Sequence, residues 1–508
     1  MDEGSYTWPG VAGLLRDRFV CVRVDTDRRP DVNERYNQGG WPTFAILDAA
    51  GEVLVGRTYV PGPELLTLLR SASDPTSRWT LAPEPAPVLG HASIDVDTLF
   101  ARVMEAWDPY HAGFGEMQKF PHAGVLDWLT DRLLRGSPHG EWTRDALART
   151  LTAMATRGMY DKVEGGFFRY ATQDDWSEPH YEKLLEDHAR LLPVYARNPG
   201  TQATIDTATR WLLRTLHDPG SGAFFGSQDA DEAYYHRPAG QRGERPPVDR
   251  TIYAGWNGLM ITALVRVGAA RSRPGLIGLA RTTAEHVRTL VGEDGCVTRH
   301  AGGVAGLLED QVQVAEGFLA VGCAFGERDW VQAAADVLDW AWARLHVPEG
   351  GLWDRAPVGI GRLRHVRRNV LGNAAYSRVA GLLGDLIGGD WPTRSDETAT
   401  AALAESEEWG FFAAPAGAAA ERRSATRVVI KVATSGWPIP DLLREGLADP
   451  HPDHVWVGVR DGVPAGMAMA CSGSACARPT ADRAELARAI AALGRRQPVP
   501  VPADPRTP

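Results

Sequence analysis

Gly165-Gly166-Phe167-Phe168 is one copy of a turn that recurs through the middle of the chain. A glycine followed by large apolar residues returns at intervals of about 50 to 75 residues, with two amphipathic helical segments between successive copies. Six such turns predict six αα-hairpins, which close most simply into an (α/α)6 toroid over residues 94–415. The other copies are Gly113-Phe114, Gly222-Ala223-Phe224-Phe225, Asp294-Gly295-Cys296, Gly350-Gly351-Leu352-Trp353 and Gly410-Phe411-Phe412.

An open α-solenoid that binds proteins is the alternative to the toroid. Solenoid repeats are usually shorter than these. They also do not place a glycine and two aromatic residues in each connection, so we favour the closed ring.

Residues 1–71 show a mixed α/β pattern with a Trp-Pro pair just before the middle strand. This order predicts a thioredoxin fold that lacks its first strand, with a cis bond between Trp41 and Pro42 facing the active site. The expected elements are a helix at 11–18, a buried strand at 19–25, a polar helix at 31–36, strands at 43–48 and 53–59, and a helix at 63–69.

Three further segments complete the predicted organisation. Residues 72–93 are rich in Pro, Ser and Ala and are expected to be a linker. Residues 425–495 predict a small α/β subdomain, with strands at 427–433 and 454–459 and helices at 440–446 and 481–493. The Pro-rich tail at 496–508 is expected to be disordered.

Composition excludes several classes of function. The formal net charge of −10 and the lack of a basic stripe argue against nucleic acid as the main partner. We find neither an apolar run of membrane-spanning length nor a signal peptide, so we expect no membrane partner and a cytoplasmic protein. Five cysteines exclude a disulfide scaffold, and Cys471 and Cys476 are too few ligands for zinc.

The densest group of polar residues lies between Gly158 and Asp187, much of it in one long inter-helix connection. A toroid exposes such connections at the mouth of its central funnel, where acids, a histidine and indoles would suit a sugar-like substrate. We expect His180 and Glu182 to be a catalytic acid/base pair, with substrate contacts from Arg169, Tyr170 and Trp176. The alternative is a salt-bridged loop, with Pro179 and Glu182 starting a helix.

A second group begins at SQDADE, residues 227–232, and continues to WNGLM at 256–260. Asp229 and Asp249 are candidate catalytic acids, and Trp256 is a candidate stacking platform. Asn257 contacts a polar ligand or caps a helix at 259–270. The Asp-x-Asp pattern lacks the further ligands of a calcium loop, so we expect no metal. No P-loop, serine-hydrolase, zincin or dinucleotide-binding motif is present, and we expect no cofactor.

Two other groups of charged residues can be explained by structural roles. Glu309 and Asp310 stand at the start of a predicted helix, where acids interact favourably with the helix dipole. The basic residues between Arg362 and Arg368 form either a solvated face or a site for a carboxylate or phosphate.

Taken together, these motifs resemble one known family. The chain contains GGWPTF, QKFPH, GMYDKVEGGFFRYATQDDW, SQDADE and WNGLM in order, and then a Cys471/Cys476/Pro479 pattern. The set resembles the bacterial relatives of spermatogenesis-associated thioredoxin-like proteins over nearly the whole chain. The resemblance implies a thioredoxin-like domain fused to a six-hairpin glycosidase-like toroid, with a carbohydrate link or an epimerase-like activity by analogy.

The sequence departs from this family at its N-terminus, where relatives carry a C-x-x-C pair upstream of residues 3–6. Either Met1 is an internal methionine of a longer protein, or the chain is truncated and this domain cannot perform dithiol chemistry. Cys21 is no substitute, because it lies in the predicted buried strand and has no partner.

The leading hypothesis is a toroid that acts on or binds a carbohydrate-like ligand. The alternative is a thiol-redox or protein-quality-control factor whose toroid is a platform for protein partners.

Overall fold

The computed structural model describes residues 1, 4–74, 76–77, 79 and 94–495, which form two compact units. Unit 1 comprises residues 1–88 and 353–367, and unit 2 comprises the rest of the chain. Most of the predicted linker and the whole predicted tail lie outside the described residues. None of the described helices combines the length and the apolar composition that crossing a membrane requires.

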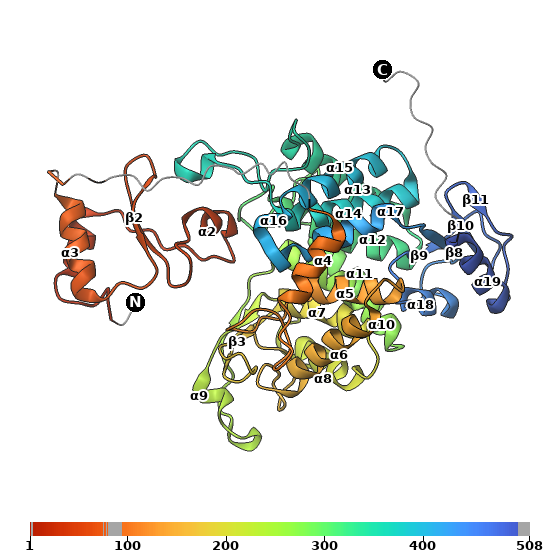
Figure 1. Ribbon diagram of the computed structural model, residues 1–508, viewed down its shortest axis with the longest axis horizontal. Coiled ribbons are helices and arrows are strands. Elements are labelled where there is room, and N and C mark those ends of the chain that lie inside the picture. Colours follow the sequence, from red (N-terminus) through yellow and green to blue (C-terminus); the bar gives the residue numbers. More distant parts are fainter. Residues whose placement is uncertain (2–3, 75, 78, 80–93, 496–508) are drawn as a thin grey trace. The chain divides into compact units, whose positions relative to one another are not determined.

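Unit 2 contains a closed ring of inner helices. Each inner helix packs against the next one, and the last packs against the first. An outer helix packs against each of them, so the described residues form the predicted (α/α)6 toroid (Figure 1). The inner helices are α5 (Ala123–Leu134), α7 (Leu185–Arg197), α10 (Ala254–Ala270), α12 (Leu308–Phe325), α14 (Val370–Ile387) and α17 (Ala414–Ser424). Their outer partners are α6 (Gly140–Thr156), α8 (Gln202–Thr215), α11 (Pro274–Arg288), α13 (Arg328–Leu345), α15 (Trp391–Ala404) and α4 (Val96–Glu105).

Narrow turns lead from the outer helices back to the inner ring. Isolated β-bridges close them, for example between Tyr160 and Phe167 and between His217 and Phe224. Gly165 and Gly222 have φ values of +86° and +71°, a region that side chains other than glycine rarely adopt. The recurrent glycine of the sequence is therefore the residue that lets the chain reverse.

A side chain from the following inner helix fastens each of four turns. In each case it belongs to the fourth residue of that helix, and it accepts a hydrogen bond from a backbone N–H of the turn at 2.5–2.8 Å. Because this contact repeats, the N-terminal ends of these inner helices all lie beside the turns, at one end of the ring. The pairs are His188 with Phe167, Asn257 with Phe224, Gln311 with Val297 and Asn373 with Leu352.

Residues 425–495 contain a four-stranded sheet in the order β11-β10-β8-β9. β8 (Val428–Ala433) pairs in parallel with the edge strand β9 (His454–Val459), and these two correspond to the strands expected from the sequence. The hairpin of β10 (Ala468–Ser472) and β11 (Ala475–Cys476) was not predicted. It carries a disulfide between Cys471 and Cys476, which face each other across the two strands. Helices α18 (Asp441–Leu447) and α19 (Arg483–Gly494) complete this part.

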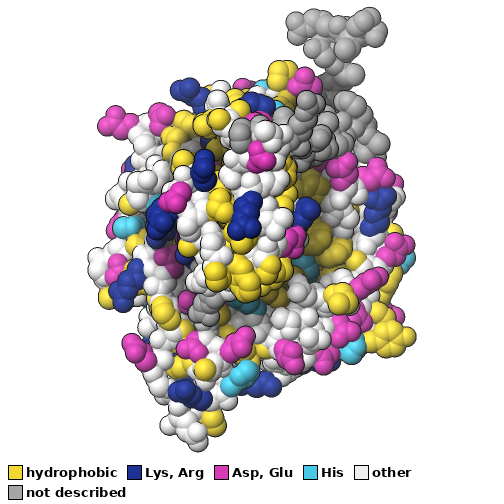
Figure 2. All heavy atoms as spheres, turned by 90° about the vertical axis from the view of Figure 1, so that its left-hand side faces the viewer, with side chains coloured by type: hydrophobic (Ala, Val, Ile, Leu, Met, Phe, Trp, Pro, Cys, Tyr) yellow, Lys and Arg dark blue, Asp and Glu magenta, His cyan; other side chains and the backbone are white. Residues whose placement is uncertain are grey.

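Unit 1 has a small antiparallel sheet of β1 (Phe44–Leu47) and β2 (Val53–Arg57). Helices α1 (Val11–Arg18), α2 (Pro30–Tyr36) and α3 (Gly62–Ser73) accompany it, and the Trp41–Pro42 bond is cis. Its core combines residues from α1, β1 and α3 with Val60. Apolar side chains also reach the surface among charged ones, as on the face drawn in Figure 2.

The predicted buried strand at 19–25 is wrong. These residues form no strand, Val20 and Val22 are 94% and 78% exposed, and Cys21 is exposed as well. In the described part of unit 1, β1 and β2 pair only with each other. A segment with strand propensity forms a strand only when another strand is available to pair with its backbone.

Residues 353–367 leave the connection between α13 and α14 and belong to unit 1. Buried ion pairs attach this segment to α2: Arg35 contacts Asp354 at 2.7 Å, and Asp31 pairs with Arg355. The expected basic face at 362–368 is thus largely engaged. Arg362 is buried, and Arg364 pairs with Glu52 at 2.8 Å.

Candidate functional site

Short strands surround the N-terminal ends of α7 and α10, and we call this end of the ring the mouth. β5 (Lys183–Leu184), β6 (Ser227–Gln228) and β7 (Val248–Asp249) form one sheet, and β3 (Tyr170–Ala171) pairs with β4 (Pro179–His180). Short helical segments complete the connections of the toroid. They are α9 (Glu232–Tyr235), η1 (Ala239–Gln241), α16 (Ser406–Trp409) and η3 (Gly410–Ala413).

A column of three rings orients His180 at the mouth. The Tyr170 ring stacks on Phe120 with a centroid distance of 4.7 Å, and its other neighbour is the His180 imidazole at 5.2 Å. The interplanar angles are 19° and 15°, so the rings are nearly parallel. Since both neighbours stack on Tyr170, its ring holds the imidazole plane in place and is not free to stack on a sugar.

His180, Glu182 and Arg169 come together beside this column. Arg169 donates a hydrogen bond to Glu182 Oε2 at 2.8 Å, and His180 Nδ1 lies 4.0 Å from the same oxygen. His180 Nδ1 is buried and makes no hydrogen bond with the described residues. The two residues predicted as an acid/base pair are thus adjacent, with an ion-paired carboxylate next to an imidazole nitrogen that has no hydrogen-bond partner among the described residues.

Asp187, in the first turn of α7, is an acid of the mouth whose pKa is strongly raised. Burial and the neighbouring Glu186 carboxylate raise the pKa of Asp187 to about 7, against the opposing effect of Arg169 and Arg190. Its Oδ2 atom is buried and accepts no hydrogen bond from the described residues. A carboxyl group that holds its proton near neutral pH is suited to general acid catalysis.

Arg190 connects two carboxylates across the ring. Its Nη2 lies 2.8 Å from Glu186 on the same helix and 3.4 Å from Glu309 on α12. Glu309 also accepts a hydrogen bond from Gln313 at 2.8 Å, and burial together with Glu186 raises the pKa of Glu309. Arg190 and Glu309 nevertheless keep 41% and 45% of their side-chain surface accessible. Groups that are surrounded by protein yet accessible line the hollow of the ring, which we call the lumen.

A second group of residues of the mouth lies at the N-terminal end of α10. Arg299 forms a buried 2.9 Å ion pair with Asp310 and stacks over the rings of Tyr253 and Trp256. Asp310 Oδ2 and Gln313 Oε1 are buried without a hydrogen-bond partner among the described residues. With Asp187 Oδ2, three buried oxygens at the ends of α7 and α12 have unused acceptor capacity.

Three residues predicted to bind substrate are buried. Trp176 is 0% exposed, and its indole N–H donates to the carbonyls of His111 and Ala112. Trp256 is 3% exposed beneath Arg299. Asn257 is 0% exposed, and its side chain bonds to the backbone of Phe224. Asn257 is also not a helix cap, since α10 begins at Ala254.

The two other predicted acids differ in position. Asp249 pairs in the sheet with Ser227, and its carboxylate accepts hydrogen bonds from Thr251 and from the Tyr253 hydroxyl. It therefore orients Tyr253 beside the mouth. Asp229 is exposed, and its side chain accepts a hydrogen bond from the neighbouring Ala230 N–H. The structure does not bring Asp229 into contact with the cluster around His180.

Sequence reasoning passed over the lumen residues of the inner helices. Glu186 and Arg190 are four positions apart on α7, and Glu309 and Gln313 are four apart on α12. Helix α12 is otherwise largely apolar and buried. Polar side chains at helical spacing on such a helix were the available signal for the lumen.

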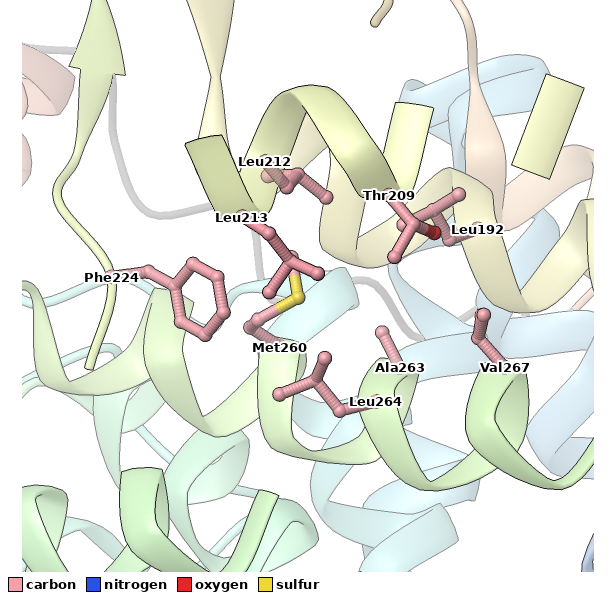
Figure 3. Close-up of a pocket in the computed structure, with 9 residues that line it drawn as sticks. All are labelled: Leu192, Thr209, Leu212, Leu213, Phe224, Met260, Ala263, Leu264 and Val267. Atoms are coloured by element: carbon pink, nitrogen blue, oxygen red, sulfur yellow. The ribbon is translucent and has the colours of Figure 1, made fainter. Parts of the chain in front are cut away.

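Two cavities lie away from these residues. The first, about 10 Å³, is a packing gap between α7, α8 and α10, and Figure 3 shows its nearly all-apolar lining. A gap of this size and polarity is not a ligand site. The second, about 540 Å³, lies between α18, β9 and α19, and includes His454, whose Nδ1 is 2.7 Å from Asp449. No residue predicted from the sequence lines it.

The described residues contain no group of three or more His, Cys, Asp or Glu side chains arranged to hold a metal ion. Their one disulfide is Cys471–Cys476, while Cys21, Cys296 and Cys323 are free.

Comparison with known sequences bears out the family resemblance. Residues 1–71 match the thioredoxin-like family Thioredox_DsbH, described as "Protein of unknown function, DUF255". Spermatogenesis-associated protein 20 of Mus musculus is 30% identical over 275 residues, which are 46% of this chain and 34% of that protein. The Homo sapiens protein of the same name is 30% identical over 290 residues, 48% of this chain and 36% of that protein. The chain spans about a third of the length of these relatives.

Solved structures of sugar-active enzymes resemble part of this chain at low sequence identity. Cellobiose 2-epimerase from Bacillus thermoamylovorans matches with a TM-score of 0.47 and 10% identity, over 60% of this chain and 85% of that one. A D-mannose isomerase matches with a TM-score of 0.48 and 12% identity, over 60% and 83%.

Proposed function

We propose that the toroid binds a carbohydrate at its mouth and carries out acid–base chemistry on it. One observation carries this proposal: the buried acceptor oxygens of Asp187, Asp310 and Gln313 have no hydrogen-bond partners among the described residues. Unsatisfied buried acceptors are costly, and a ligand rich in hydroxyl donors satisfies several of them at once. A sugar is such a ligand.

The proton-transfer roles follow from the two environments at the mouth. Asp187, with its raised pKa, is the proton donor. His180 and Glu182 form the accepting side, where Arg169 balances the carboxylate charge and the ring column fixes the imidazole. Asp249 supports the site through Tyr253, and Asp229 has no role in it.

A test needs only binding. Saturation-transfer NMR with a panel of neutral monosaccharides and disaccharides reports contact between a sugar and the protein. We expect signals for some panel members with wild type and much weaker signals with Asp187→Ala and Glu309→Ala. Glu285→Ala, on the outer helix α11, is the matched control and should behave as wild type. A wild-type protein that gives no signal with any sugar contradicts the proposal.

A further inference from the structure

Arg266 stands out on the most buried helix of the ring. All residues of α10 from Ala254 to Ala269 are buried except Arg266, which is exposed. Helices α7, α11 and α12 pack around α10. The charges that act on the Arg266 guanidinium come from α5, α7, α12 and α14. Because these are inner helices on several sides of the ring, the side chain extends into the lumen.

The neighbouring lumen arginines all have partners. Arg197 contacts Asp127 at 2.5 Å and also pairs with Asp131. Arg378 makes two hydrogen bonds to Glu316, at 2.8 Å and 2.5 Å. Arg266 makes no hydrogen bond or ion pair with any described residue. Asp127 and Glu316 attract its charge from a distance but are already engaged by Arg197 and Arg378.

An unpaired guanidinium in this position is in an unfavourable environment. The protein that surrounds the lumen and the nearby Arg197 lower the pKa of Arg266, while Asp127 and Glu316 act in the opposite direction. Arginine nevertheless keeps its charge in proteins. Its planar fork of N–H donors matches carboxylate and phosphate groups, which bind it through two parallel hydrogen bonds. A charged fork without a counter-ion is therefore a receptor for an anionic group.

The position of Arg266 along α10 determines how long the ligand must be. Twelve residues separate it from the first residue of α10, which corresponds to about 18 Å along the helix axis. Even with the side chain pointing back toward the mouth, a single sugar ring at Asp187 would not reach it.

We propose that Arg266 binds the carboxylate or phosphate group of an acidic carbohydrate longer than one sugar unit, whose charged end points into the lumen. The proposal rests on the proposed function, since it names the substrate class of the same toroid. The lumen residue thus selects for charge, and the mouth residues bind hydroxyl groups.

Calorimetry with matched disaccharides tests this selection. The probes are cellobiose, cellobiouronic acid and cellobiose 6′-phosphate, together with inorganic phosphate. We expect at least one acidic disaccharide to bind wild type ten-fold or more tightly than cellobiose. The two acidic probes distinguish a carboxylate from a phosphate as the preferred group.

Variants test whether the preference for acidic over neutral disaccharides depends on Arg266. Arg266→Met should reduce this preference below about three-fold, and Arg266→Lys should retain part of the preference. Arg210→Met, an exposed position on the outer helix α8, should keep all of it. Circular dichroism confirms that each variant is folded. If Arg266→Met fails to fold, Arg266→Lys still tests the proposal. A preference for acidic disaccharides that is unchanged in Arg266→Lys contradicts recognition by the guanidinium group.

The outcomes separate the two proposals. Equal binding of neutral and acidic disaccharides to wild type overturns the role of Arg266 and leaves the proposed function intact. If neither these disaccharides nor any sugar of the neutral panel binds, the proposed function fails. In that case, binding of inorganic phosphate that depends on Arg266 would still support an anion site at this residue. If phosphate does not bind, the anion site is overturned as well.

Discussion

Arg190 on α7 reaches Glu309 on α12, with Nη2 and Oε1 3.4 Å apart, although α10 stands between these two helices in the ring. Both side chains are accessible, so the pair itself contributes little stability. Its meaning is geometric: the lumen is narrow enough at this level for side chains of non-adjacent helices to meet.

Asp187→Asn should change how stability depends on pH. The folded-state pKa of about 7 exceeds the ordinary value of 3.8, so between these pH values the folded protein holds a proton that the unfolded chain releases. Wild type therefore loses stability as pH rises through this window, and Asn, which is never charged, does not. We expect the variant to be about 2 kcal/mol more stable than wild type at pH 8 and nearly equal to it at pH 4.

Urea unfolding at a series of pH values checks this expectation. Asp461→Asn, at an exposed loop position, is the control and should follow the wild-type curve. Parallel curves for wild type and Asp187→Asn would show that Asp187 has an ordinary pKa.

Tyr170→Leu should release the His180 imidazole. The stacked Tyr170 ring shifts the resonances of the imidazole protons, and its loss should move them downfield and broaden them. Proton–carbon NMR of ring-labelled histidine measures the change, with His180→Gln to assign the signal. Tyr110→Leu is the control, because Tyr110 is 84% exposed. An unmoved His180 signal in Tyr170→Leu contradicts the ring column.

Asn257→Ala should destabilise the toroid by about 3 kcal/mol. The Asn257 side chain accepts from the Phe224 N–H at 2.8 Å and donates to the carbonyls of Phe224 and Tyr253, each at 2.9 Å. Alanine leaves these buried backbone groups without partners. Denaturant unfolding followed by circular dichroism measures the loss. Gln202→Ala, exposed at the start of α8, should cost less than 0.5 kcal/mol, and an equally small loss for Asn257→Ala would exclude a structural clamp.

Asp31→Ala should free residues 353–367 within unit 1. Asp31 is buried and pairs with Arg355 and, at 2.9 Å, with Arg29, so its removal leaves the buried Arg355 uncompensated. We expect trypsin to cleave this Arg-rich segment several-fold faster than in wild type, as mass spectrometry of the fragments would show. Asp17→Ala, which removes an exposed ion pair, is the control. Unchanged cleavage would mean that α2 does not hold the segment.

The toroid could be predicted because its signals are local. The glycine of each turn has a positive φ, and in most turns a buried apolar residue follows it, such as Phe114, Phe167 or Phe224. The strand at 19–25 could not be judged in this way, because strand formation depends on a partner elsewhere in the chain. The β10–β11 hairpin was missed for a related reason: its five-residue and two-residue strands carry little periodic signal.

The candidate site was only partly predictable. His180, Glu182 and Arg169 are close in sequence, and their contact follows from the β3–β4 pairing. Asp187 was not singled out within the polar group that begins at Gly158, since its raised pKa comes from burial and from Glu186 in the folded protein. Trp176 and Asn257 were over-interpreted, because sequence does not distinguish an indole or amide at a mouth from one buried beneath it.

The central claim, that the mouth binds a carbohydrate, is tested most directly by a crystal structure with the tightest-binding sugar of the panel. We predict density for the sugar at the N-terminal ends of α7 and α12, with a hydroxyl group within hydrogen-bond distance of Asp187 or Glu309. A sugar found instead in the 540 Å³ cavity beside His454, with the mouth free of it, would contradict the account.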